Sequence, residues 1–152
     1  MGLDQYLTAR RFLWIYDNGE GKDAEIGKSI QVLFPEIAQY RPRNVSVEIG
    51  YWRKANAIHR WFVDNLQDGE DDCRETPVTL GALQKLLDTV NEVLADTSKA
   101  EELLPTQSGF FFGSTQYDKW YQDDLIHTKN IIQGILDNKS LQDWDFYYSS
   151  SW

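Results

Sequence analysis

Cysteine and histidine are scarce in this chain, whose 152 residues include one cysteine, Cys73, and two histidines. A single cysteine excludes an intramolecular disulfide framework and favours a reducing compartment. No apolar run approaches the roughly 20 residues that cross a bilayer. Residues 1–6 also lack the basic and apolar regions of a signal peptide. We therefore expect a cytoplasmic protein, and the absence of zinc-type spacing predicts no metal and no cofactor.

Positive charge is scarce in the second part of the chain. Residues 1–65 carry 9 basic and 8 acidic side chains, whereas residues 66–152 carry 6 and 16. Binding to DNA or RNA requires a basic surface that displaces counterions, so this balance disfavours direct nucleic-acid binding. Six of the seven arginines lie in the first part, so an anion site should draw on that part. The acidic part has two interpretations, surface solubility and imitation of phosphate charge.

The order of sequence patterns predicts an α+β fold in a single domain covering residues 1–152. We expect a small, mostly antiparallel or mixed sheet packed by about four helices. Extended segments are predicted at residues 3–16, 44–51 and 144–152, with a turn at 18–21. Helices are predicted from Asp23 to before Pro35, over 52–66, as a short segment capped by Ser98, and over about 116–137. A further helix is predicted after Thr79, where Leu83, Leu86 and Val90 keep helical spacing. Residues 67–77 are predicted to form an acidic loop.

Three consecutive phenylalanines stand between two glycines in the segment 104–115. Gly109 and Gly113 permit a positive φ or a close backbone approach, and Thr115 with Asp118 has the spacing of a capping pair. Aromatic rings beside the free N–H groups of a helix start favour a nucleotide-like or phosphorylated ligand. A short buried strand followed by an ordinary cap is the alternative interpretation. The candidate ligand residues here are Phe110, Phe111, Phe112, Ser114, Thr115 and Tyr117.

Arg53, Asn56 and Arg60 are three and four residues apart in the predicted helix 52–66. On one helical side they would form a group of donors able to hold a carboxylate or phosphate. His59 falls within the apolar side of the same helix. Each prediction has a structural alternative, which is a solvated surface for the arginines and a hydrogen-bonded core imidazole for His59.

Asp124 is predicted at the edge of the apolar side of the helix 116–137. A carboxylate there should find a partner, because an unpaired buried charge is costly. Arg53, Arg60, His59 or a tyrosine hydroxyl could serve. A pair with His59 would resemble the general base and orienting acid of a hydrolytic site. No phosphate loop, dinucleotide fingerprint or nucleophile elbow accompanies these residues.

Three blocks of this sequence resemble a small family of bacteriophage and prophage proteins without assigned activity. The blocks are MGLDQYLT at residues 1–8, GYWRKANAIHRWFV at 50–63 and LLPTQSGFFFGSTQY at 103–117. The resemblance covers most of the chain but brings no catalytic residue, substrate or fold with it. It implies a biological context, the infected host cell, because small accessory phage proteins often disarm host defences or redirect host metabolism.

These observations predict a phage-type accessory protein in the host cytoplasm that binds a nucleotide-like or phosphorylated small molecule. Its role would be counter-defence, for example sequestering a host signalling nucleotide. One alternative is an acidic inhibitor that binds a host defence protein or nucleic-acid enzyme, with aromatic residues as interface anchors. A second alternative is a small nucleotide hydrolase that uses His59 with Asp124. Binding is favoured over catalysis, and no membrane contact is expected.

Overall fold

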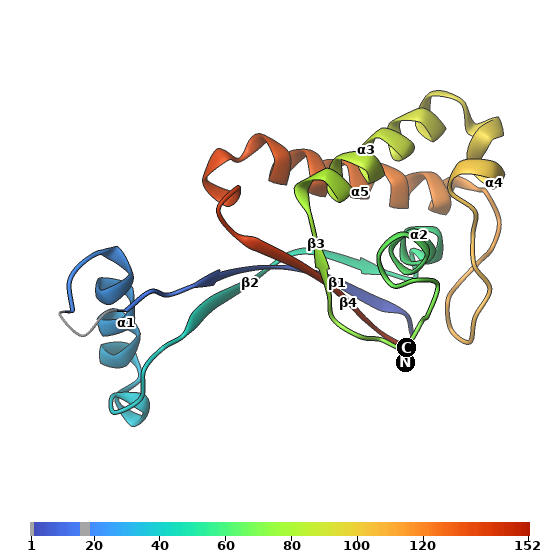
Figure 1. Cartoon of the computed structure of the whole chain (residues 1–152). Helices are drawn as coiled ribbons and strands as arrows, with labels where there is room; N and C mark the ends of the chain where they lie inside the picture. Colours follow the sequence, from blue (N-terminus) through green and yellow to red (C-terminus); the bar gives the residue numbers. More distant parts are fainter. Residues whose placement is uncertain (1, 16–18) are drawn as a thin grey trace. The chain divides into compact units, whose positions relative to one another are not determined.

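The chain folds into a four-stranded sheet with helices, as described for residues 2–15 and 19–152 in a computed structural model. This confirms the predicted α+β class. By their contacts the residues divide into two compact units, a first unit of Met1–Ala9 with Glu48–Trp152 and a second unit of Arg10–Val47. The elements, labelled in Figure 1, are β1 (Asp4–Phe12), α1 (Lys22–Leu33), β2 (Asn44–Arg53), α2 (Asn56–Leu66), β3 (Thr76–Val78), α3 (Leu80–Ala95), α4 (Ala100–Leu103), α5 (Lys119–Asp137) and β4 (Asp145–Ser151).

The antiparallel sheet has the strand order β2-β1-β4-β3, so the last strand along the chain lies inside it. β3 pairs with β4 in a register that places Thr76 opposite Tyr148 and Val78 opposite Phe146. The sequence predicted a loop at residues 67–77, and the strand at its end was missed because Pro77 is unusual in strands. An edge position tolerates it, since one side of an edge strand needs no N–H donors.

Helices α3 and α5 lie side by side along the sheet in the first unit (Figure 1). Leu83, Leu86 and Val90 of α3 are fully buried, as the helical spacing predicted. Leu125 and Ile132 supply the matching apolar face of α5. Each such side chain stabilises the fold by about 1.5–3 kcal/mol on burial. The first unit therefore has a substantial core of its own, on which a rigid site can be built.

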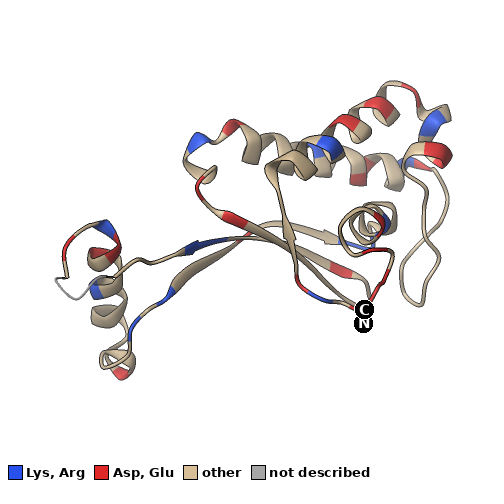
Figure 2. Cartoon of the chain, viewed as in Figure 1, with Lys and Arg blue, Asp and Glu red and all other residues tan. Residues whose placement is uncertain are grey.

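Acidic residues are distributed along the helices of the first unit (Figure 2). Asp88 on α3 and Glu101 and Glu102 on α4 are exposed. These three acidic side chains of the second part of the sequence are therefore displayed to solvent. No helix among the described residues is long and apolar enough to cross a bilayer.

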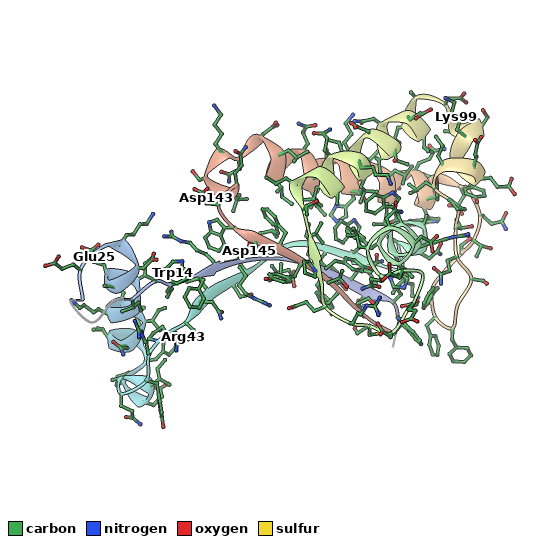
Figure 3. The ribbon with its side chains drawn as sticks, viewed as in Figure 1. Trp14, Glu25, Arg43, Lys99, Asp143 and Asp145 are labelled. Carbon is green, nitrogen blue, oxygen red and sulfur yellow. The ribbon has the colours of Figure 1, made fainter. Side chains whose placement is uncertain are left out.

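The second unit is organised by polar contacts around Asp23. Its carboxylate accepts hydrogen bonds from the Arg11 side chain at 2.6 Å and from the Trp14 backbone N–H at 3.0 Å. Trp14, labelled with Glu25 and Arg43 in Figure 3, is 64% exposed. The helix predicted from Asp23 to before Pro35 is confirmed as α1. Tyr16 and Asn18, which belong to the predicted extended segment and turn, lie outside the described residues.

Two helix starts differ from the prediction. α2 begins at Asn56, and residues 52–53 belong to β2, because Lys54 adopts a left-handed φ of 60° that separates strand from helix. α5 begins at Lys119 rather than near Gln116. Its N-cap is Asp118, whose carboxylate accepts the Tyr121 N–H at 3.2 Å. A carboxylate at the N-cap also complements the helix dipole, so the helix begins three residues downstream of the predicted start.

Candidate functional site

A pocket of about 380 Å³ opens in the first unit, where the end of β2, the start of α2, the loop 104–118 and the first turns of α5 meet. This volume is within the range of about 300–1,000 Å³ typical of ligand pockets. Its walls contain two cations, Arg53 and Lys54, and two carboxylates, Asp118 and Asp124. Trp120 also lines this pocket, and its side chain is 75% exposed.

Lys54 sits at this pocket in a backbone conformation that lysine rarely adopts. Its φ is 60°, which costs a residue with a side chain about 1–2 kcal/mol. The turn is held on both sides, because the Lys54 N–H donates to the Leu3 carbonyl at 2.7 Å and its carbonyl accepts the Asn56 N–H at 2.9 Å. Neither Arg53 nor Lys54 forms an ion pair within the described part of the chain. Strain retained beside two unpaired cations is typical of a functional site.

Asn56 holds the loop that forms one wall of the pocket. Its Nδ2 donates to the carbonyls of Phe112 at 3.1 Å and Ser114 at 2.9 Å, and its Oδ1 accepts the Gln107 N–H at 3.0 Å. The side chain is buried. Its hydrogen-bonding groups are thus engaged with the loop rather than directed at the pocket.

The phenylalanine run forms neither a buried strand nor a wall of the pocket. Phe112 is buried, whereas Phe110 is 80% and Phe111 is 47% exposed at a turn. The turn needs both glycines: Gly113 has a φ of 90°, and a Cβ at Gly109 would lie 2.6 Å from the Phe112 ring. Phe112 therefore anchors the loop while the other two rings project from its tip.

Three further predicted ligand residues brace the loop 104–118 instead of lining the pocket. The Arg60 guanidinium donates to the Thr106 carbonyl at 3.1 Å and to the Asp64 carboxylate at 3.3 Å. The Thr115 carbonyl accepts from the Thr106 hydroxyl at 3.0 Å, and the Tyr117 hydroxyl accepts the Thr106 N–H at 3.3 Å. Of the predicted ligand residues, those on the pocket wall are Arg53, Asn56 and Ser114.

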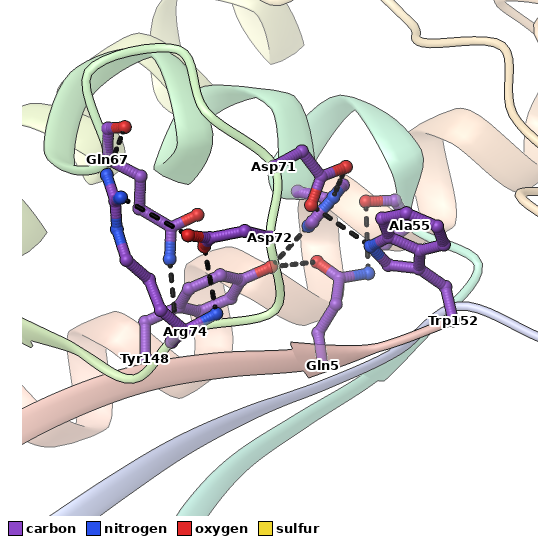
Figure 4. Close-up of polar contacts among 9 residues, drawn as sticks. Gln5, Ala55, Gln67, Asp71, Asp72, Arg74, Tyr148 and Trp152 are labelled. Carbon is purple, nitrogen blue, oxygen red and sulfur yellow. Dashed lines mark hydrogen bonds and ion pairs between the residues drawn. The ribbon is translucent and has the colours of Figure 1, made fainter.

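His59 is fully buried in a hydrogen-bonded network that is separate from the pocket walls. Its Nδ1 lies 2.7 Å from the Tyr148 hydroxyl and its Nε2 lies 2.8 Å from an Asp71 oxygen. Figure 4 shows how Gln5 and Trp152 complete the network, with Trp152 Nε1 donating to Asp71 at 3.0 Å. Burial raises the pKa of Tyr148 well above its usual value. The imidazole is thus buried and hydrogen-bonded, as the core interpretation expects, and it does not reach the pocket.

Asp124 is the unpartnered carboxylate of the pocket. It lies one turn of α5 away from Trp120, and among the described residues its side chain accepts no hydrogen bond and forms no ion pair. Burial raises its pKa to about 6, opposed by His127 and reinforced by the carboxylates of Asp123 and Asp118. Asp124 therefore does not pair with His59, whose two ring nitrogens contact Tyr148 and Asp71. A perturbed, unpaired carboxyl in a pocket is typical of a ligand-binding position.

Sequence reasoning missed Lys54 and Trp120. A signal for Trp120 existed, because a tryptophan on the polar side of a helix, four residues before Asp124, has no partner in the core. Nothing in the sequence indicated a role for Lys54, since residue types do not show that its backbone adopts a left-handed φ. Among residues 2–15 and 19–152, no group of three or more His, Cys, Asp or Glu side chains could hold a metal ion.

Comparison with known proteins gives no match, whether to a protein-family model, a curated protein or a solved structure.

Proposed function

We propose that this protein binds a nucleotide-like, phosphorylated small molecule in the pocket between β2, α2 and α5, without catalysing a reaction on it. One observation carries this proposal. Within the part of the chain that the structure describes, the pocket combines two cations without an ion pair, Arg53 and Lys54, with an exposed indole at Trp120 and a carboxylate without a hydrogen bond or ion pair at Asp124. A ligand that satisfies all four must carry an anionic group, a flat ring and a hydrogen-bond donor.

The four side chains have separate roles in this proposal. Arg53 and Lys54 hold the phosphate, as cations do in phosphate-binding sites. Trp120 stacks on the base, because indole faces bind aromatic rings independently of their sequence. Asp124 accepts from an N–H of the base. The start of α5 takes no part, since the Asp118 carboxylate occupies the N-cap where an anion would bind.

The resemblance to phage proteins supports a counter-defence role in the host cytoplasm, in which the protein sequesters a host signalling nucleotide. Sequestration requires affinity and no chemistry. That requirement fits the pocket, because His59, the best general base in the sequence, has both ring nitrogens engaged in the core.

Isothermal titration calorimetry tests the proposal with cyclic dinucleotides, ADP-ribose derivatives and nucleoside monophosphates. We expect micromolar or tighter binding of at least one of them. Arg53→Gln and Lys54→Gln should each weaken that binding about tenfold or more, because each removes a charge-assisted contact. Lys85→Gln is the matched control, since Lys85 is an exposed lysine of α3 bonded to Asn65. No binding across the panel would overturn the proposal.

A second candidate function, inhibition of a host protein, is favoured by the loop tip. Phe110 and Phe111 form an edge-to-face pair with ring centroids 4.4 Å apart, and both are exposed on a loop braced by Asn56 and Arg60. Rigid exposed aromatic rings are typical interface anchors. Host lysate passed over the wild-type protein and over a Phe110→Ser, Phe111→Ser variant would test it. A host protein retained by both, or by neither, would contradict this function.

A further inference from the structure

The carboxylate of Asp124 and the indole of Trp120 lie one helical turn apart on the same pocket wall. Side chains at this spacing are neighbours, with about 5–6 Å between their Cβ atoms. A flat ring stacked on Trp120 therefore brings one of its edges to Asp124. The cations come from a different part of the chain, since Arg53 is the last residue of β2 and Lys54 follows it. The pocket thus separates a base-reading wall from a phosphate-holding wall.

The identity of the base follows from what a carboxylate can do. An ionised carboxylate only accepts hydrogen bonds, and its two oxygens match two parallel N–H donors. Guanine presents such a pair, N1–H beside the N2 amino group. Adenine and cytosine each place a ring-nitrogen acceptor next to their amino donor, so one carboxylate oxygen would face a lone pair. Uracil flanks its single N–H with two carbonyl oxygens.

We infer that the pocket selects guanine nucleotides, with Asp124 accepting from N1–H and the N2 amino group of a base stacked on Trp120. This inference rests on the proposed function and specifies its ligand class. Asp124 is free for this contact, because it has no partner within residues 2–15 and 19–152. Its raised pKa, about 6, still leaves it mostly ionised at neutral pH.

A guanidinium group also offers two parallel donors, so an arginine side chain is the chemical rival of guanine. The electrostatics of the pocket favour guanine. Arg53 and Lys54 repel a guanidinium, whereas they attract the phosphate that a guanine nucleotide carries.

The test compares guanosine, inosine and adenosine monophosphates by calorimetry on the full chain at pH 7.5. Inosine lacks only the N2 amino group, so it should bind about tenfold more weakly than guanosine monophosphate. Adenosine monophosphate loses both contacts, and it should bind about a hundredfold more weakly. Free arginine is included as the rival ligand and should not bind.

Asp124→Asn is the diagnostic variant. An amide offers one acceptor oxygen beside an N–H donor, a pattern that suits adenine and not guanine, so guanosine monophosphate should lose about tenfold or more in affinity while adenosine monophosphate loses none. Asp123→Asn removes the same charge from the adjacent, exposed position outside the pocket walls, and it should leave all affinities as they are. Melting curves for both variants confirm that they are folded.

The outcomes separate this inference from the function on which it rests. Equal affinities for the three nucleotides, or an Asp124→Asn variant that keeps the guanine preference, overturn the guanine inference and leave nucleotide binding intact. Tighter binding of arginine than of guanosine monophosphate overturns it as well. Failure of every nucleotide to bind contradicts the proposed function itself.

Discussion

The imidazole Nδ1 of His59 lies 2.7 Å from the hydroxyl of Tyr148 in the core of the first unit. This contact joins α2 to β4 across 89 residues of chain. The other imidazole nitrogen bonds Asp71 of the acidic loop, so one buried ring ties together three separate segments. Such a ring contributes to the stability of the fold. Its removal should therefore lower the stability of the protein more than its affinity for a ligand.

His59→Ala should lower the free energy of unfolding by about 1–3 kcal/mol, because Tyr148 and Asp71 each lose the hydrogen bond to the imidazole. Urea denaturation followed by tryptophan fluorescence measures the change. His127→Ala is the control, since His127 is exposed and contacts the Tyr51 carbonyl at 2.9 Å. Equal stability of the two variants would show that the His59 network contributes little.

Lys54→Gly should be more stable than Lys54→Ala by about 1 kcal/mol, because glycine adopts a left-handed φ without the steric cost that alanine retains. Both variants lack the ammonium group and should bind nucleotide less tightly than the wild type. Thermal melting and calorimetry on the same samples give both quantities. If Lys54→Ala were the more stable variant, the strain at this position would be negligible.

Asn56→Ala should release the loop 104–118. Two carbonyls and one N–H would lose their partner, which lowers stability by about 1–3 kcal/mol. Ligand affinity should fall too, since Ser114 of that loop lines the pocket. Hydrogen exchange of the loop amides reports the release directly. Asn130→Ala, at an exposed asparagine of α5, should change neither property.

Asp124→Asn should raise stability at pH 7.5 by about 1 kcal/mol, after allowance for solvent screening of this half-buried group. The pKa of Asp124 is raised from 3.8 to about 6 in the folded protein. The ionised form therefore destabilises the fold, and the stability that protonation supplies is lost as pH rises through about 6. Below pH 4 the two proteins should melt alike. A constant difference between pH 4 and pH 7.5 would contradict the raised pKa.

The preference for guanosine over adenosine monophosphate should fall as pH drops below about 6. A protonated Asp124 cannot accept two hydrogen bonds, and its pKa in the free protein is about 6. The ratio of the two affinities isolates this group, because both ligands carry the same phosphate. Calorimetry at pH 5 and pH 7.5 measures the ratio, and Asp124→Asn should show no such change.

Local patterns predicted much of the fold and little of the site. The buried spacing of Leu83, Leu86 and Val90 predicted α3, because helical periodicity is a property of neighbouring residues. The starts of α2 and α5 were misplaced, since each depends on the conformation of one residue. Lys54 ends β2 through its left-handed φ, and Asp118 caps α5 in place of Thr115.

The pocket could not be predicted from the sequence, because the contacts that form it join residues far apart along the chain. Arg53 and Ser114 were both predicted to bind ligand, yet their meeting depends on Asn56, which ties the loop to the start of α2. Asp124 was recognised as a carboxylate in need of a partner, and Arg53, Arg60, His59 or a tyrosine hydroxyl were left open as that partner. It faces the pocket instead, because His59 is already satisfied by Tyr148 and Asp71.

The edge strand β3 has a consequence for the behaviour of the protein at high concentration. Exposed edge strands recruit strands of other molecules and so seed aggregation. β3 is three residues long and its central residue is Pro77, which has no N–H to donate. The sheet therefore ends on this side in a strand that makes a poor template for intermolecular pairing.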